Sequence, residues 1–126
     1  MPSDPRDPLT ENILGAAIAV HRELGPGLLE SAYEACLAYE LGLRHLRFER
    51  QVAIPIVYRG THIDCGYRAD LVVEDEILVE IKAVERLLPI HGIQLLSYLR
   101  LSSRRVGLLI NFHALLLKDG IRRISN

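Results

Sequence analysis

The sequence predicts an α/β (α+β) fold with one central mixed β-sheet flanked by helices. Three observations predict it: helical periodicity near the start, alternating apolar residues in the middle, and a helix between two apolar strands. A chain of 126 residues suits one domain with one core. We expect a flexible leader over residues 1–9 and a single domain over residues 10–126. Its element order is α-α-β-β-β-α-β, followed by a C-terminal β-hairpin.

Two helices are expected at the start of the domain. The first spans residues 10–24, because its apolar side chains recur at helical spacing, and Thr10 is its predicted N-cap. The GPG segment at 25–27 ends it. The second helix runs over residues 29–41, and Gly42 is expected to adopt the left-handed conformation that follows many helix ends.

Three strands are expected in the middle of the chain. Alternation of apolar residues marks residues 48–58 as the first strand, and Arg59-Gly60 as the turn after it. Residues 61–73 form the second strand and residues 76–83 the third.

The last third of the chain is expected to form a helix, a strand and a hairpin. Pro89 suits the first turn of a helix that reaches Leu101. The segment RRVGLLINF at 104–112 is apolar on both faces, which is typical of a buried strand. The C-terminal hairpin is expected to turn at Asp119-Gly120.

Composition restricts the location and the partners of the protein. The chain is 49% apolar and 25% charged, so it is expected to fold, and no apolar run approaches the roughly 20 residues of a membrane helix. Cys36 and Cys65 lack metal-binding spacing and are expected to be reduced thiols, so we expect a cytoplasmic protein without membrane contact. A net charge of −1 argues against a general electrostatic binder of nucleic acid. It allows an enzyme that meets phosphates through a metal and a local basic patch.

The stretch YRADLVVEDEILVEIKA at 67–83 places charges among apolar strand residues. Charges in a sheet are costly to bury unless they are paired or bind a metal. Alternation puts Glu80 and Lys82 on one face of the third strand. Asp70 lies opposite Glu80 if the strand pairing centres on Asp75, whereas a two-residue turn would point Asp70 away. A metal site therefore requires a loop with an odd number of residues, or a bulge.

Two carboxylates at this separation repel one another unless a cation lies between them or one is protonated. Oxygen ligands without nearby Cys or His favour Mg²⁺ or Mn²⁺ over zinc. Lys82 could hold a metal-polarised water or stabilise charge on a phosphate. The alternative interpretation is a surface pair of Glu80 and Lys82 with an exposed Asp70.

These residues resemble a known pattern. Asp70, nine residues, then Glu80-x-Lys82 is similar to the PD-(D/E)XK signature of a large nuclease superfamily, although Ala69 replaces the usual proline before the aspartate. The proline is no ligand, so its absence leaves the chemistry unchanged. The segments HGIQLLSYLRL and GLLINF resemble the later helix and strand of one group of relatives, the GxxExxY proteins.

The motif that names the GxxExxY proteins is matched by GLLESAY at 27–33, through Gly27, Glu30 and Tyr33. The resemblance runs from about Thr10 to the end of the chain. It implies a restriction-endonuclease-like core and hydrolysis of phosphodiester bonds in nucleic acid, with DNA as the expected substrate.

The resemblance also implies roles for individual residues. Asp70 and Glu80 would bind Mg²⁺ or Mn²⁺, joined by Glu30 and by the Ile81 carbonyl, and Lys82 would orient the attacking water. From its position alone, Glu30 could instead complement the dipole of its helix.

Residues of the two flanking helices are expected to contact substrate. Gln94 and Tyr98 share a helix face and resemble a motif of the exonuclease-like branch that contacts the DNA backbone. The alternative is a polar face turned to solvent. Tyr33 is a further candidate for substrate contact, or a core residue with its hydroxyl at the rim. His91 is a secondary candidate for proton transfer.

The leading functional hypothesis is a metal-dependent nuclease. The alternative is a catalytically inactive nuclease-fold module for binding or assembly. A third interpretation is a homodimer or a larger complex, in which apolar residues of LLLKDGI at 115–121 form the interface.

Overall fold

A five-stranded mixed sheet forms the centre of the protein in the computed structural model, which describes residues 7–126. The elements in chain order are α1 (Pro8–Leu24), α2 (Glu30–Leu43), β1 (Phe48–Ala53), β2 (Ile56–Tyr58), β3 (Thr61–Ile63), β4 (Arg68–Val73), β5 (Ile77–Lys82), α3 (Pro89–Leu101), β6 (Val106–Asn111), η1 (Leu117–Gly120) and β7 (Ile121–Ser125). The strand order is β1-β4-β5-β6-β7; β5 and β6 are parallel and the other neighbours antiparallel. The predicted fold class is thereby confirmed, and α3 has the bounds predicted for it.

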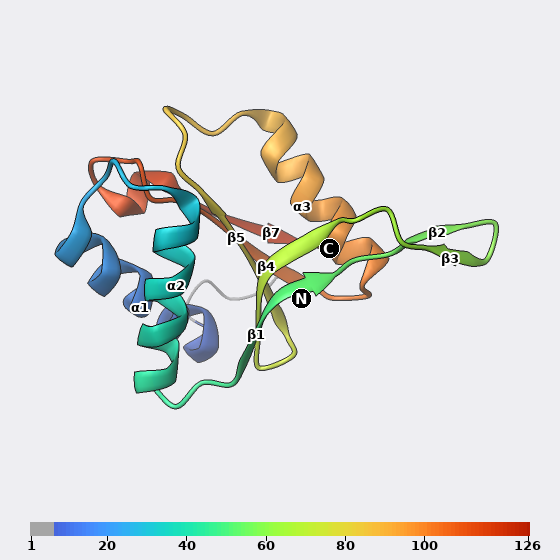
Figure 1. Cartoon of the computed structure of the whole chain (residues 1–126), viewed down its shortest axis with the longest axis horizontal. Coiled ribbons are helices and arrows are strands. Elements are labelled where there is room, and N and C mark those ends of the chain that lie inside the picture. Colours follow the sequence, from blue (N-terminus) through green and yellow to red (C-terminus); the bar gives the residue numbers. More distant parts are fainter. Residues whose placement is uncertain (1–6) are drawn as a thin grey trace.

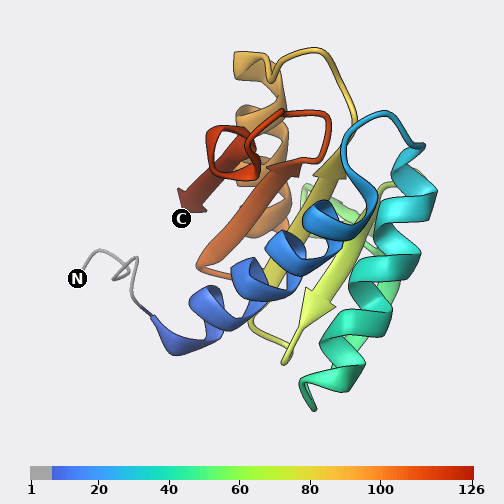
Figure 2. The ribbon, with the colours of Figure 1, turned by 90° about the vertical axis from the view of Figure 1, so that its left-hand side faces the viewer.

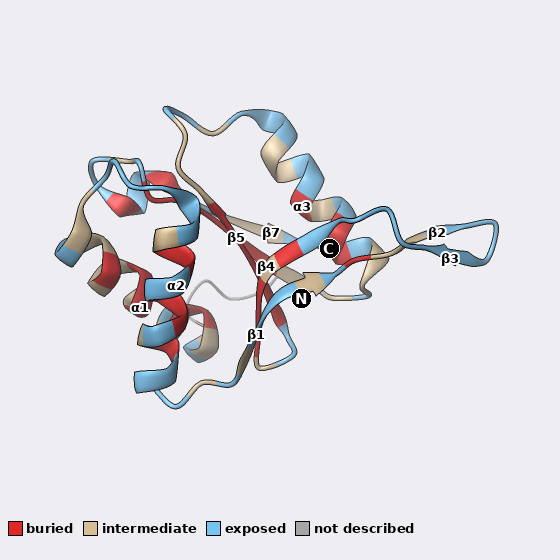
Figure 3. Cartoon of the chain, viewed as in Figure 1, coloured by how far each residue is buried: buried red, intermediate tan, exposed pale blue. Residues whose placement is uncertain are grey.

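Helices cover both faces of the sheet, with α1 and α2 on one face and α3 on the other (Figures 1 and 2). Apolar side chains accordingly pack in two layers, and β5 is buried along most of its length (Figure 3). The layer under α1 and α2 contains Ile13, Ala17, Leu37, Leu41, Leu71, Val79, Ile81 and Phe112. The layer under α3 contains Ile54, Val72, Leu78, Leu95, Leu99 and Leu109.

The start of α1 differs from the prediction, because Thr10 is not its N-cap. Asp7 takes that position: its Oδ1 accepts from the backbone N–H of Leu9 at 3.3 Å, and its Oδ2 from the Thr10 hydroxyl at 3.0 Å. A proline at the first helical position supports this start. The helix therefore begins inside the leader expected over residues 1–9, of which residues 1–6 lie outside the described residues.

The end of α2 also differs, because the helix continues through Gly42. The left-handed residue is His45, with φ of 59°. The backbone N–H of Leu46 donates to the Leu41 carbonyl and that of His45 to the Gly42 carbonyl, both at 3.0 Å, which is a Schellman motif. Leu46 then packs against the core layer that contains Leu41, an apolar contact that commonly accompanies this motif and favours this ending over one at Gly42.

The first two predicted strands are each divided into two. Pro55 separates β1 from β2, and residues 64–67 separate β3 from β4. The predicted turn at Arg59-Gly60 is confirmed: both residues have positive φ, 52° and 78°, as a two-residue hairpin turn requires. The resulting β2–β3 ribbon projects beyond the main sheet (Figure 1).

The C-terminal hairpin does not turn at Asp119-Gly120. Those residues lie in η1. Residues 112–120 connect β6 to β7, which pairs antiparallel with β6. Neither residue has the positive φ that a two-residue hairpin turn needs. Gly120 instead packs closely against the backbone of Asn111.

The described residues contain no helix with the length and apolar character to cross a membrane. Cys36 and Cys65 are both exposed free thiols.

Gly120→Ala is expected to destabilise the protein by about 1–3 kcal/mol, because its methyl group would lie 2.5 Å from the Asn111 carbonyl oxygen. Gly42→Ala is the matched control. It adds a methyl to the last turn of α2 in open space, and should stabilise the protein by up to about 1 kcal/mol. Urea unfolding of both variants measures the difference, and equal midpoints would contradict the close packing at Gly120.

Candidate active site

The turn between β4 and β5 decides which side chains meet. The register pairs Val73 with Ile77, so the turn has three residues and centres on Asp75. This is the odd-numbered loop that the metal-site hypothesis required. By the same register, Asp70 lies opposite Glu80.

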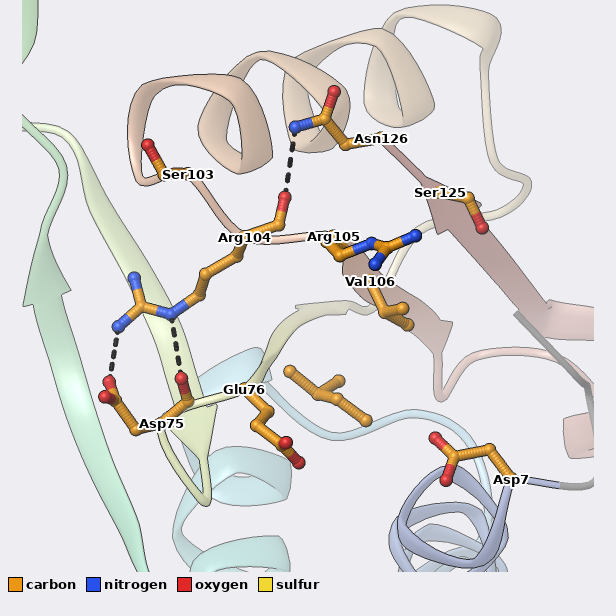
Figure 4. Close-up of a pocket in the computed structure, with 10 residues that line it drawn as sticks. Asp7, Asp75, Glu76, Ser103, Arg104, Arg105, Val106, Ser125 and Asn126 are labelled. Carbon is orange, nitrogen blue, oxygen red and sulfur yellow. Dashed lines mark hydrogen bonds and ion pairs between the residues drawn. The ribbon is translucent and has the colours of Figure 1, made fainter. Parts of the chain in front are cut away.

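Arg104 holds this turn in place. Its Nη2 lies 2.7 Å from Asp75 Oδ1, and its Nε donates to the Asp75 carbonyl at 3.4 Å (Figure 4). Glu74 accepts from the backbone N–H of Arg47 at 2.6 Å. Glu74 and Asp75 both have positive φ, 53° and 55°, so these bonds offset the cost of an uncommon backbone conformation.

The Arg104 contact borders a hollow of about 700 Å³, which Figure 4 shows. The hollow lies where β5 and β6 begin, whereas Glu80 and Lys82 lie at the far end of β5. Its charged groups include the ion-paired Asp75 and Arg104. The hollow and the carboxylates are therefore separate places in the fold.

Side chains replace the backbone pairing of β4 and β5 at Asp70 and Glu80. The last backbone pair on this side is Leu71 with Val79. Beyond it, Asp70 Oδ2 accepts from the backbone N–H of Ile81 at 2.8 Å, and Glu80 Oε1 accepts from the backbone N–H of Asp70 at 3.1 Å. The carboxylates thus bind backbone N–H groups at the point where the backbone ladder between β4 and β5 has ended.

The environment of these carboxyl groups favours their protonated forms. Burial raises the pKa of Glu80 to about 8, and the charge of Asp70 adds to the shift, while Lys82 acts against it. Burial also raises the pKa of Asp70, although hydrogen bonds from Ile81 and Gln51 act against that shift. A proton or a cation is therefore stabilised between the two groups.

Helix α2 adds two further carboxylates. Glu30 Oε2 accepts from the backbone N–H of Ala83 at 3.2 Å, and its charge raises the pKa of both Asp70 and Glu80. Glu34 is buried, and its charge raises the pKa of Asp70. Glu34 was not predicted from the sequence. The available signal was its spacing of four residues from Glu30, which puts both on one face of the helix.

Gln51 joins Glu34 to Asp70 and was also not predicted. Its Nε2 donates to Glu34 Oε1 at 2.6 Å and to Asp70 Oδ1 at 3.2 Å. Its φ of 51° lies in the left-handed region, which is uncommon for a residue with a side chain and rarer still in a strand. Strain of this kind concentrates at functional sites. The Nε of Arg50 lies 3.0 Å from Glu34 and compensates its buried charge.

Helix α3 contributes Gln94 and Tyr98. Gln94 Nε2 donates to the Tyr98 hydroxyl at 3.3 Å. Burial raises the pKa of Tyr98, and the charge of Glu80 is the next cause, so Tyr98 lies within the electrostatic reach of the carboxylates. The Tyr67 ring lies against the Tyr98 ring, with centroids 5.9 Å apart.

Two predicted residues are engaged elsewhere in the fold. Tyr33 is fully buried and stacks on Phe112 at 4.6 Å, and its hydroxyl donates to the Gly25 carbonyl and accepts from the Leu28 N–H. His91 Nδ1 accepts from the backbone N–H of Leu88, the N-cap residue of α3, at 3.0 Å. The contacts of both side chains are structural, and the structure does not bring either one to the paired carboxylates.

A protein-family model described as the PD-(D/E)XK nuclease superfamily matches residues 7–124. The chain belongs to this superfamily. The resemblance to the superfamily is confirmed, and the five-stranded sheet with flanking helices is consistent with its restriction-endonuclease-like fold. Searches of the curated proteins and of the solved structures found no match. Membership indicates nuclease activity, with nucleic acid as the partner.

PD-(D/E)XK nucleases generally use divalent metals such as Mg²⁺. Across residues 7–126, no group of three or more His, Cys, Asp or Glu side chains is arranged to hold a metal ion. A smaller donor set is present in the carboxylates of Asp70 and Glu80. Mg²⁺ commonly binds one or two carboxylates and keeps several waters, so the residues fit this ion.

With EDTA present, the free energy of unfolding is expected to fall as the pH rises from about 5 to about 8. The folded protein keeps a proton on Glu80 up to a pKa of about 8, whereas the unfolded chain releases it near 4.5. The folded state therefore binds more protons in this window, and the slope approaches about 1.4 kcal/mol per pH unit. Urea unfolding at several pH values measures it.

Glu80→Gln should flatten most of this slope, whereas Glu85→Gln, at an exposed position, should leave it unchanged. A stability that stays constant or rises across the window would contradict the buried, protonated Glu80.

Proposed function

We propose that this protein is a Mg²⁺- or Mn²⁺-dependent nuclease that hydrolyses phosphodiester bonds, with DNA as its substrate. The observation that carries the proposal is the pair of carboxylates, half-buried Asp70 and buried Glu80, beside Lys82 in a member of a nuclease superfamily. Perturbed carboxyl groups held close together are typical of functional sites.

In this proposal Asp70 and Glu80 hold the ion together with the Ile81 carbonyl. Glu30, whose charge reaches both carboxylates, joins directly or through a water. When bound, the ion supplies positive charge that offsets the charge of the transition state and makes a water more acidic. Gln51 and Glu34 keep Asp70 oriented toward the site.

Lys82 orients the attacking water through its ammonium N–H donors. The water oxygen bonds to phosphorus while the bond from phosphorus to the leaving oxygen breaks, and that oxygen gains a proton. The products are a phosphate monoester and a hydroxyl. Gln94, with amide donors and an acceptor, and Tyr98 position the phosphate backbone.

We also propose that the chain is a GxxExxY protein, because the three motif residues form one positioning unit. Gly27 has φ of 111°, which favours glycine. Tyr33 binds Gly25 and Leu28 through its hydroxyl and so fixes the loop before α2. The loop in turn directs Glu30 to the end of β5.

Lys82→Ala is expected to lower kcat by about 10²–10⁴-fold with little change in KM, because it removes a group that acts on the reacting water. Cleavage of labelled single- and double-stranded DNA and RNA, in Mg²⁺ and in Mn²⁺, measures it. Lys118→Ala, on the exposed surface of η1, is the matched control and should retain full activity. A Lys82→Ala protein that cuts as fast as wild type would contradict the role proposed for Lys82.

Titration with Mn²⁺ should reveal a site that is weakened more than about 10-fold in Glu80→Ala. Affinity should rise as the pH approaches 8, because a proton must leave Glu80 before the ion binds. Glu40→Ala, which removes the half-buried partner of Arg44, should bind Mn²⁺ normally. Absence of the site in wild type, or its retention in Glu80→Ala, argues against a metal-dependent enzyme.

A further inference from the structure

The β2–β3 ribbon is exposed to solvent and adds no strand residue to the apolar core. None of its strand residues belongs to either core layer, and it projects away from the sheet (Figures 1 and 3). Tyr58 is 60% exposed, and Val57 and Ile63 are each more than 40% exposed. An isolated two-stranded ribbon is marginally stable in water, and exposed apolar side chains gathered in one place commonly mark an interaction site.

The ribbon is connected directly to the proposed active site. It leaves the sheet from β1 and β4, the strands that carry Gln51 and Asp70. At its base, the Tyr67 ring lies against Tyr98, whose hydroxyl accepts from Gln94. A molecule bound along the ribbon would therefore lie beside the carboxylates.

The tip of the ribbon carries a positive charge. The Arg59 guanidinium lies 5.8 Å from the centre of the Tyr58 ring, and no ion pair involves it within residues 7–126. Arg68 at the base is instead paired with Asp64 at 3.4 Å. On a chain with net charge −1, an uncompensated arginine beside an exposed tyrosine suits a phosphate and a base or sugar.

We infer that the β2–β3 ribbon is a DNA-binding arm, which enters the major groove of duplex DNA while the adjacent backbone meets the active site. The inference rests on the proposed nuclease function and narrows its substrate to duplex DNA. The major groove of B-form DNA, about 12 Å wide, admits a two-stranded ribbon. The major groove of duplex RNA is too narrow and deep for side chains to read.

The test compares two substitutions of Arg59 in a Lys82→Ala parent, which binds without cutting. Arg59→Asn removes the charge but suits the positive φ of the turn, and Arg59→Lys keeps the charge. Fluorescence anisotropy with Mg²⁺ present measures binding to duplex DNA, duplex RNA and single-stranded DNA of one sequence, at several salt concentrations.

Arg59→Asn should weaken duplex DNA binding about 5–10-fold and reduce the slope of log affinity against log salt by about 1. Arg59→Lys should keep both values, as should the control Arg22→Ala on the exposed end of α1. The parent should bind duplex DNA more tightly than the other two ligands. Unchanged affinity in Arg59→Asn, or equal binding of duplex RNA, overturns the inference.

The outcomes separate this inference from the nuclease proposal. If wild type binds duplex DNA through Arg59 but never cuts it, the DNA-binding role of the ribbon is supported and the nuclease proposal is contradicted. If wild type cuts DNA and Arg59→Asn leaves KM and kcat unchanged, the nuclease proposal is supported and the DNA-binding role of the ribbon is contradicted. A dimer seen by sedimentation and lost in Tyr58→Ala, without any effect on DNA binding, assigns the ribbon to self-association and also overturns the inference.

Discussion

The site depends on two hydrogen bonds in which carboxylates accept from backbone N–H groups just beyond the end of the β4–β5 ladder. Asp70 receives the N–H of Ile81, and Glu80 receives the N–H of Asp70. Unpaired backbone N–H groups at this depth would be costly, and the carboxylates satisfy them while leaving further oxygen lone pairs free. The same arrangement that satisfies these backbone N–H groups thus concentrates negative charge at one point.

This charge is stable only because other elements converge on it. Arg50 compensates Glu34, Gln51 connects Glu34 to Asp70, and Lys82 partly offsets Glu80. The left-handed backbone at Gln51 is the local cost of that connection. Stability and chemistry therefore oppose each other in one small region, and the two apolar layers elsewhere supply the stability that tolerates it.

The sequence predicted those features that depend on local periodicity. Alternation put Glu80 and Lys82 on one face of a strand, and a proline with helical spacing located α3. The position of Asp70 depended on the length of the turn, which the sequence left open and the register decides. Two errors were local, because Asp7 and not Thr10 caps α1, and Pro55 interrupts the first predicted strand. The others occurred where packing or contacts between elements decide the structure. Helix α2 does not end at Gly42 as predicted, but in a Schellman motif at His45 and Leu46, where Leu46 packs on the core. Glu34 and Gln51 act across two elements, and no pattern within either element predicts that they meet.

The turn at Asp75 also has a consequence for inheritance. Because side chains alternate between faces, a slip of one residue in the pairing of β4 with β5 would set Asp70 opposite Val79 and turn it away from Glu80. The bonds from Arg104 to Asp75 and from Arg47 to Glu74 hold the three-residue turn that prevents this slip. An inherited change in the turn that shifts the register would therefore disable the carboxylate pair without altering either carboxylate.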